Sequence, residues 1–405
     1  MKKRFIVLVL DSFGVGYMDD VPMVRPEDTG ANTCKHILEK FPHLELKNLE
    51  KLGLMNALGE EINKMKKSSF CTYGKAELMH FGGDTFFGHQ EIMGTYPKKP
   101  LMKPFSFYID KVYDALIKKG YQVEKTGRTE NGLYYLMVNG CIAVGDNLET
   151  DLGQVYNVTS TLQEQDFESI LKVGRIVRAN VEVARVIVFA GENSSRESIK
   201  AAAEEKEGRY MGINAPKSRV YEKGYMVRHL GYGINPEVQV PTIMGKAEKK
   251  VVLIGKVADI VENEHGKSYM GLVDTKTIFE IALDEIEKMD EGFMCINIQE
   301  TDLAGHGQDA AKYAEILGVS DFYIGKIIEK IADEDILIVT ADHGNDPTIG
   351  HSQHTRENVP VLIYKKNMKN TFIGVRKSLS DIGATAAEYF GIEKTENGES
   401  FLEII

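Results

Sequence analysis

The sequence is poor in several features that would assign a protein to a particular class. Its four cysteines, Cys34, Cys71, Cys141 and Cys295, form no Cys-x-x-Cys pair. They are therefore read as reduced cytosolic thiols, and not as a disulfide framework or a zinc knuckle. No apolar run approaches the length that crosses a bilayer.

The chain also lacks an excess of positive charge. Acidic residues outnumber basic ones by 60 to 49, which gives a formal net charge of -11. Because no surplus of cations is available to neutralise phosphates or anionic lipid, we expect neither nucleic acid nor a membrane as a partner. We expect a cytoplasmic protein.

Apolar residues are plentiful, at 43% of 405 residues, which is enough for a large core and two domains. Short strand-like runs alternate with amphipathic helical segments near both ends, and this alternation predicts a mainly parallel sheet between helices. Prolines 97, 100 and 104 interrupt that pattern. We therefore predict an α/β core formed by 1–103 and 226–405, with an α+β cap domain, 104–225, inserted between its two parts.

Three strand-like runs are each followed by potential metal ligands. The carboxyl ends of strands in an open α/β sheet face the ligand crevice, so these groups are expected to form one composite site. Carboxylates and imidazoles without a thiolate suit manganese or zinc. The runs are 5–10, 293–298 and 336–339, and the groups that follow them are Asp11, Asp302 with His306, and Asp342 with His343 and His354.

These motifs resemble those of the alkaline phosphatase superfamily of metalloenzymes. Within it, the segment 340–348, Thr-Ala-Asp-His-Gly-Asn-Asp-Pro-Thr, followed by His-Thr-Arg-Glu at 354–357, is similar to that of phosphopentomutases. The segment 82–94 is similar to the one that carries the family's phosphorylated threonine. The resemblance covers both ends of the chain well and the middle poorly. It implies an alkaline-phosphatase-like core with an inserted cap.

The resemblance also implies roles for individual residues. Thr85 would be the phosphoacceptor, although a threonine in such a segment, taken alone, is more often a turn or helix-cap hydroxyl. The implied reaction interconverts ribose 1-phosphate and ribose 5-phosphate, with a sugar bisphosphate as activator and two divalent ions, manganese or else zinc, as cofactors. One ion would be held by Asp11, Thr85, Asp342 and His343, and the other by Asp302, His306 and His354.

Substrate contacts carry over less directly. Asp151, Arg209 and Lys256 match family positions that contact the phosphosugar, but a polar loop explains Asp151 as well, and surface arginines are common. The chain also departs from the family, which has a lysine where Gly83 stands and a tryptophan where Gln90 stands; this sequence contains no tryptophan.

Two other functions stay open. A metal-dependent phosphohydrolase or phosphonate hydrolase would use the same ligands with water as the acceptor, and a mutase could act on a different phosphosugar. A non-catalytic metal or phosphosugar binding protein would require the loss of a ligand or of the nucleophile, and all of them are present.

Overall fold

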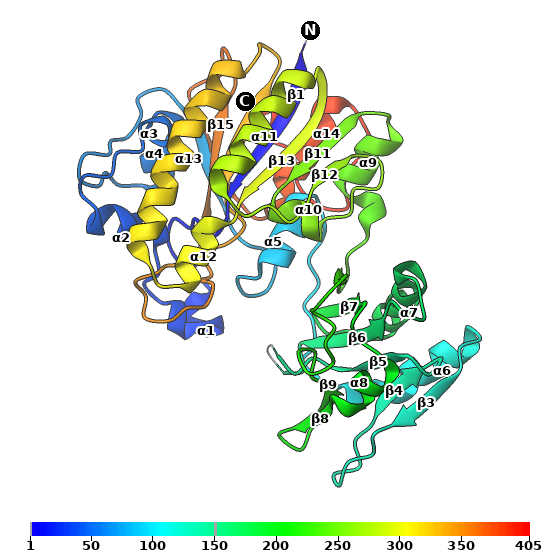
Figure 1. The fold of residues 1–405 in the computed structure, drawn as a ribbon. Coiled ribbons are helices and arrows are strands. Elements are labelled where there is room, and N and C mark those ends of the chain that lie inside the picture. The colour runs from blue at the N-terminus through cyan, green and yellow to red at the C-terminus, as the bar shows by residue number, and fades with distance from the viewer. Residues whose placement is uncertain (1, 150–151) are drawn as a thin grey trace. The chain divides into compact units, whose positions relative to one another are not determined.

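The structure is a computed structural model that describes residues 2–149 and 152–405. It divides into two compact units, Met1–Pro97 with Asn235–Ile405 and Lys98–Ile234 (Figure 1). The segment predicted as an insert, 104–225, lies within the second unit. Within the described part of the chain, no helix is both long enough and apolar enough to cross a membrane.

The first unit is built on an eight-stranded sheet with the order β12-β11-β13-β1-β14-β15-β2-β16. The strands from β12 to β14 in this order are parallel, whereas β15 runs antiparallel to both of its neighbours. The sheet is therefore mainly parallel, as predicted. Its strands are β1 Lys3–Leu10, β2 Thr72–Ala76, β11 Lys250–Ile254, β12 Lys267–Tyr269, β13 Glu291–Ile298, β14 Ile336–Thr340, β15 Val359–Tyr364 and β16 Thr371–Arg376.

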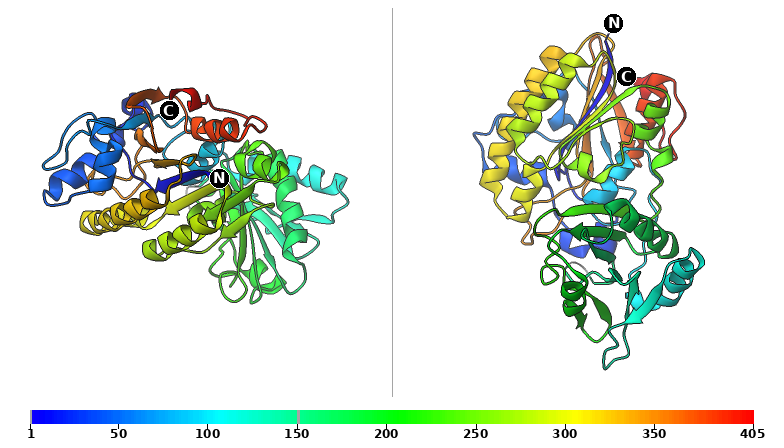
Figure 2. Two further views of the ribbon diagram at one scale, coloured as in Figure 1. Left: turned by 90° about the horizontal axis from the view of Figure 1, so that it is seen from above. Right: turned by 45° about the vertical axis from the view of Figure 1, so that its right-hand side comes forward.

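Helices cover both faces of this sheet. α11 and α13 lie on one face, and α9 and α14 lie on the other (Figure 2, right). This double cover explains why the central strands are apolar along their whole length. The helices of the unit are α1 Val21–Val24, α2 Thr33–Lys40, α3 Lys47–Leu52, α4 Leu54–Leu58, α5 Thr85–Ile92, α9 Val240–Lys246, α10 Lys256–Ile260, α11 Thr275–Lys288, α12 Glu300–His306, α13 Ala310–Lys330 and α14 Ser380–Phe390.

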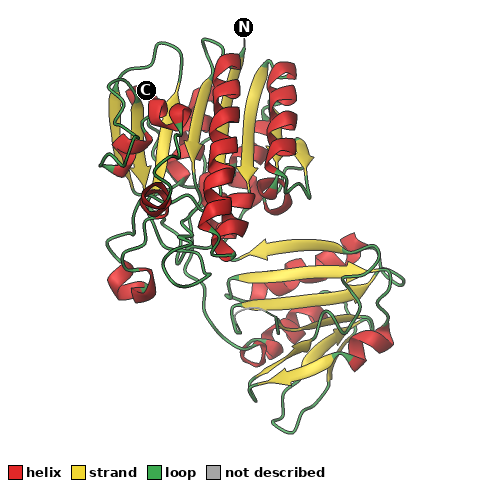
Figure 3. Cartoon of the chain, turned by 60° about the vertical axis from the view of Figure 1, so that its left-hand side comes forward, coloured by secondary structure: helices red, strands yellow, loops and turns green. Residues whose placement is uncertain are grey.

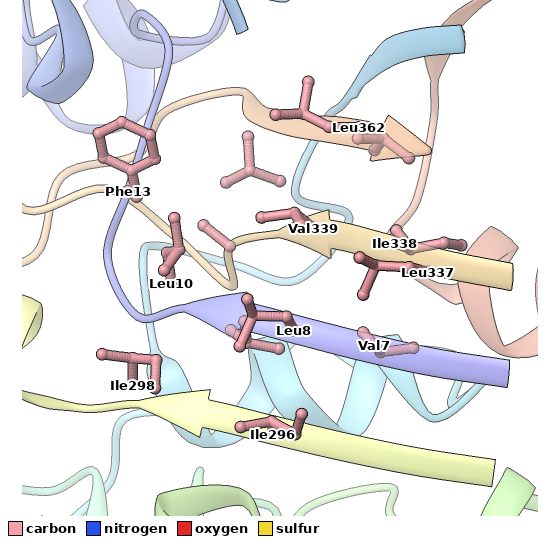
Figure 4. Packing of buried hydrophobic residues seen from close by; sticks show 14 of the residues in the cluster. Val7, Leu8, Leu10, Phe13, Ile296, Ile298, Leu337, Ile338, Val339 and Leu362 are labelled. Carbon is pink, nitrogen blue, oxygen red and sulfur yellow. The ribbon is translucent and has the colours of Figure 1, made fainter. Parts of the chain in front are cut away.

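The centre of the core is strand β1, which lies between β13 and β14 (Figure 4). Leu8 is fully buried and pairs with Ile296 on one side and Val339 on the other. This register aligns the carboxyl ends of the three strands at one edge of the sheet. The polar residues that follow β1, β13 and β14 are thus brought together by apolar packing.

The second unit contains a sheet with the order β10-β7-β6-β5-β4-β3, to which β9 and β8 are added through β5 (Figure 3). α6 and α7 share an apolar cluster with one face of the sheet, and α8 contributes Ile199 to a smaller cluster. The elements are α6 Ile109–Lys118, β3 Val123–Thr126, β4 Tyr135–Val138, β5 Ile142–Asp146, β6 Val155–Thr161, α7 Phe167–Asn180, β7 Arg185–Gly191, α8 Arg196–Ala201, β8 Ala203–Lys206, β9 Tyr210–Ile213 and β10 Met226–Gly231.

Candidate metal centre

Three buried side chains meet where β1 and β14 end. Nε2 of His343 lies 3.6 Å from Oδ1 of Asp11 and 3.3 Å from Oδ2 of Asp342. All three residues are fully buried, and their ligand atoms lie within 4.8 Å of one another, as in sites that hold a metal ion. Asp11 is the first residue after β1, and Asp342 is the second residue after β14. Because β1 and β14 are neighbouring strands, the sheet sets the spacing of these two carboxylates.

Thr85 joins this group at the first residue of α5. Its Oγ1 donates a hydrogen bond of 2.7 Å to Oδ2 of Asp342. The N-cap of the helix is Asp84, whose side chain accepts a hydrogen bond from the Phe87 N–H. The Thr85 hydroxyl therefore does not serve as the helix cap. His89, one turn further along, lies 3.1 Å from the same Asp342 oxygen and holds the carboxylate from a second side.

Asp302, His306 and His354 form a second, adjoining group. Asp302 Oδ1 lies 3.2 Å from His354 Nε2 and 3.5 Å from His306 Nε2. The ring of His354 stacks on that of His343, with centroids 3.9 Å apart. Asp302 and His306 lie on α12, the short helix after β13, and His354 lies in the loop before β15. The structure therefore gathers all seven predicted ligands into one cluster within the first unit.

The three imidazoles are oriented alike by backbone carbonyls. Nδ1 of His343 faces the Gly344 carbonyl at 2.9 Å, Nδ1 of His306 faces that of Ser352 at 2.7 Å, and Nδ1 of His354 faces that of Gly83 at 2.6 Å. Since a carbonyl only accepts, each Nδ1 carries the proton and each Nε2 keeps a lone pair. A neutral imidazole held in this way is a ready metal ligand.

Two observations show that the cluster fits divalent metal. Oδ1 of Asp11 and Nε2 of His343 are buried without a hydrogen-bond partner, and Nε2 of His306 lies only 2.9 Å from Nε2 of His354. Two nitrogen lone pairs that face each other at this distance need a proton or a metal ion between them. Buried polar atoms likewise need a partner, and a metal ion bound by these residues would supply it.

The charges of the cluster agree with this interpretation. Burial, with the nearby charges of Asp342 and Asp302, raises the pKa of Asp11 to about 7. Burial also lowers the pKa of His343 to about 3, which keeps that imidazole neutral and able to coordinate. Three buried carboxylates and a neutral imidazole gathered in this way form a suitable environment for a divalent cation.

Lys256 is the cation that lies nearest these carboxylates. It opens α10, and its Nζ lies 3.0 Å from both Asp11 Oδ2 and Asp302 Oδ2. Burial alone would lower the pKa of Lys256, but the charges of Asp11 and Asp302 outweigh it and raise the pKa. This lysine, which was predicted as a phosphate contact, therefore lies between the two groups of ligands as a fixed positive charge.

Arg356 and Glu357 support the site, although sequence reasoning gave them no role. The Arg356 guanidinium donates to the carbonyls of Leu78, His80 and Gly82 at 2.7 to 2.9 Å, and so holds the loop that leads to Thr85. Glu357 accepts from the Gly16 and Thr33 N–H groups. Only their place in the His-Thr-Arg-Glu motif pointed to them.

The two departures from the family have local structural reasons. A Cβ on Gly83 would lie 3.1 Å from the Thr355 carbonyl oxygen and 3.3 Å from the His354 Cβ, so glycine allows the loop to approach the His354 ring. Gln90 is buried, donates to the Ile260 carbonyl at 2.7 Å and accepts from Gln239 at 2.6 Å. It links α5 to the segment that follows the second unit.

The remaining predicted substrate contacts belong to the second unit. Arg209 is exposed in the turn between β8 and β9, where its guanidinium lies over the Tyr210 ring at 5.7 Å. Asp151 lies outside the described residues. Of the predicted substrate contacts, Lys256 lies in the cluster within the first unit.

A mainly parallel sheet with buried carboxylates and imidazoles at its carboxyl edge defines a metal-dependent α/β enzyme. The family model of the metalloenzyme superfamily matches residues 3–394 of this chain. A phosphopentomutase of Alkaliphilus oremlandii is 30% identical over 99% of this chain and 98% of its own length, and one of Symbiobacterium thermophilum is 30% identical over 100% and 98%. A solved phosphoglycerate mutase of Leishmania mexicana aligns with 99% of this chain and 97% of its own at 11% identity, with a TM-score of 0.45.

The chain therefore belongs to the metalloenzyme superfamily, and within it the chain is phosphopentomutase-like. It is an enzyme that uses divalent metal.

Proposed function

We propose that this enzyme is a phosphomutase that moves a phosphoryl group between hydroxyls of a pentose phosphate. The reaction is of the type that interconverts ribose 1-phosphate and ribose 5-phosphate. The observation that carries the proposal is the Thr85 hydroxyl, which donates to Asp342 at 2.7 Å within a cluster of metal ligands. The relatives named phosphopentomutase support it, because they match nearly the whole chain.

The proposal includes two bound divalent metal ions, with manganese as the expected metal. One set of ligands is Asp11, Thr85, Asp342 and His343, and the other is Asp302, His306 and His354. When bound, such ions supply charge stabilisation for the transferring phosphoryl group and favour ionisation of the threonine hydroxyl.

Residues of the chain would carry the phosphoryl group and the proton during the reaction. In the working cycle, phospho-Thr85 gives its phosphoryl group to the free hydroxyl of a sugar monophosphate, so the bond to Thr85 Oγ1 breaks as a bond to the sugar oxygen forms. The resulting bisphosphate reorients, and its other phosphoryl group returns to Thr85. In the first transfer the sugar hydroxyl loses its proton as the Thr85 oxygen, on leaving the phosphoryl group, takes one up. In the second transfer the Thr85 hydroxyl gives its proton to Asp342 Oδ2, which accepts its hydrogen bond, and the sugar oxygen that loses its phosphoryl group takes up a proton.

Charge on the transferring group is met from two further directions. Lys256 holds an ammonium 3.0 Å from Asp11 and Asp302. Thr85 opens α5, and the N–H groups of a helix's first turn favour negative charge. A sugar bisphosphate would prime the enzyme by phosphorylating Thr85, and Arg209 and Asp151 would contact the non-reacting end of the sugar phosphate.

The test is an assay of the purified enzyme with manganese on ribose and deoxyribose phosphates, with and without a sugar bisphosphate. We expect isomerisation that the bisphosphate stimulates, and its loss in Thr85→Ala. Because Gly83 and Gln90 differ from the family, the substrates should include hexose phosphates. Release of free phosphate without isomerisation would instead identify a phosphohydrolase, and full turnover by Thr85→Ala would remove the nucleophile from the proposal.

A further inference from the structure

His89 is a fully buried histidine on α5, one helical turn after Thr85, and it contacts two groups of the metal centre. Its Nδ1 lies 3.0 Å from the Thr85 carbonyl oxygen and 3.1 Å from Oδ2 of Asp342. Because a carbonyl and an ionised carboxylate only accept, Nδ1 carries a proton and donates to them. The same Asp342 oxygen accepts from the Thr85 hydroxyl. His89 therefore helps to fix the oxygen that this hydroxyl contacts.

Asn297 links the opposite edge of the His89 ring to Asp11. It is fully buried near the end of β13, where it pairs with Val9 of β1. Its amide nitrogen lies 3.1 Å from Oδ2 of Asp11 and 3.1 Å from Nε2 of His89. Since an ionised Asp11 can only accept, the amide presents its nitrogen to this carboxylate. Nε2 of His89 then accepts from the second N–H of the same amide.

The two side chains thus hold one oxygen of each of two metal-binding carboxylates. His89 donates to Oδ2 of Asp342, and Asn297 donates to Oδ2 of Asp11. Lys256 donates to the same Asp11 oxygen. Within the described part of the chain, Oδ1 of Asp11 is buried without a hydrogen-bond partner. The hydrogen bonds therefore orient Asp11 so that its other oxygen is available to a metal ion.

The helix that carries His89 also packs closely against Asp342. A Cβ on Gly88 would lie 2.6 Å from the Asp342 carbonyl oxygen and 2.9 Å from the Asp342 Cβ. Glycine at this position therefore allows α5 to approach the end of β14. Backbone contact sets the place of the helix, and the hydrogen bonds of His89 then set the orientation of the carboxylate.

We propose that His89 and Asn297 are a positioning pair, which orients Asp342 and Asp11 as metal ligands and holds the main chain of Thr85 beside them. Hydrogen bonds from residues behind the ligands commonly tune the affinity of a metal site. Both side chains are completely buried, so they act through the groups that they contact. The part that concerns metal rests on the metal centre alone, whereas the part that concerns Thr85 rests on the proposed function.

Two substitutions of His89 separate the two edges of its ring. The amide nitrogen of asparagine reaches the place of Nδ1, whereas the amide of glutamine reaches the place of Nε2. His89→Asn therefore keeps the donor to Asp342, and His89→Gln loses it. We expect the dissociation constant for manganese to rise by about 10- to 100-fold in His89→Gln and by less than about threefold in His89→Asn. Manganese titrated into the metal-free enzyme, with the free ion followed by electron paramagnetic resonance, measures both.

Asn297→Leu tests the second member of the pair, because it removes both N–H groups at nearly constant volume. It should raise the dissociation constant for manganese by about tenfold. The matched control is Cys295→Ala, which shortens a buried side chain two residues earlier on the same face of β13. The control should bind manganese like the wild type, and circular dichroism and thermal unfolding confirm that each variant is folded.

The activity of the same variants tests the part that concerns Thr85. In His89→Gln, kcat should fall by about tenfold at saturating manganese, because a small displacement of the nucleophile is enough, while KM for the sugar phosphate stays unchanged. His89→Asn should keep most of the wild-type kcat. A rise in KM with an unchanged kcat would overturn this part.

The metal measurement decides the rest without any substrate. If folded His89→Gln and Asn297→Leu bind manganese like Cys295→Ala, the pair does not orient the ligands and the proposal is overturned. Equal losses in His89→Asn and His89→Gln would overturn the assignment of Nδ1 as the donor to Asp342. If the wild type releases phosphate without isomerisation, the proposed function fails, whereas the manganese dissociation constants still decide whether His89 and Asn297 position the ligands.

Discussion

Asp11 in the first unit and Asp146 in the second make an instructive pair. Each lies at the carboxyl end of a strand, each is almost completely buried, and burial raises the pKa of each to about 7. Their partners differ. Asp146 accepts from the backbone N–H groups of Phe105 at 2.8 Å and Met211 at 2.9 Å.

Asp11 instead faces an imidazole, a lysine and a second carboxylate, and one of its oxygens has no hydrogen-bond partner. A raised pKa thus shows that a carboxyl group is buried, and its contacts show whether the group has a structural role or can bind a cation. At Asp146 the backbone partners make a link between β5, β9 and the start of the second unit. At Asp11 the unsatisfied oxygen and the neighbouring ligands make a place for a cation.

The largest expected effect separates these two carboxylates directly. Asp11→Asn removes a charged ligand, so we expect kcat/KM to fall by on the order of a thousandfold or more and the bound metal to decrease. Asp146→Asn should leave both quantities unchanged. Steady-state kinetics and metal analysis of the two purified variants test this. Equal losses in both would mean that the second carboxylate also serves the chemistry.

The next prediction asks whether ligands that differ in burial contribute differently. The His306 side chain is 43% exposed, whereas that of His343 is fully buried. His306→Ala should weaken the binding of one metal equivalent by about 10- to 100-fold, and excess manganese should restore much of the activity. His343→Ala should not be rescued. The measurement is activity against metal concentration, and rescue of both variants alike would contradict the distinction.

Much of the first unit could be predicted from the sequence, because its signals are local. The runs at 5–10, 293–298 and 336–339 are short, apolar and rich in β-branched residues, and the strands observed there are buried as such runs require. Since β1, β13 and β14 are parallel neighbours, the polar residues after them had to share one edge. Placing Asp11, Asp302 and Asp342 together therefore needed only the strand assignments.

Other parts of the site depend on contacts that no local pattern encodes. Arg356 acts on carbonyls more than 270 positions away in the chain, and the partners of a buried guanidinium cannot be identified from its neighbours in sequence. Asp146 shows the opposite difficulty. Like Asp11, it lies at the carboxyl end of a strand. Placement at a strand end therefore could not have distinguished a structural carboxylate from a metal ligand.

A pH experiment isolates the structural member of the pair. Because the folded-state pKa of Asp146 is raised to about 7, its contribution to stability is complete below the unfolded value near 4 and is lost as pH rises through about 7. The free energy of unfolding should therefore fall by about 2 to 3 kcal/mol between pH 5 and pH 8.

In Asp146→Asn this part of the pH dependence should vanish, and stability at pH 5 should be lower because Asn cannot accept from both N–H groups. Urea unfolding of both proteins at the two pH values measures the difference. A variant with the same pH dependence as the wild type would show that Asp146 is ionised in the folded protein.

The smallest effect concerns Arg356, which holds backbone in the first unit much as Asp146 does in the second. A lysine ammonium cannot reach the carbonyls of Leu78, His80 and Gly82 together, so Arg356→Lys should let the loop before Thr85 shift. We expect kcat to fall about tenfold, because a small misplacement of the nucleophile is enough, while KM and metal content stay unchanged. Arg376→Lys, which alters a partly buried arginine paired with Asp381, is the matched control. If kcat in Arg356→Lys equals that of this control, the guanidinium stabilises the fold without positioning Thr85.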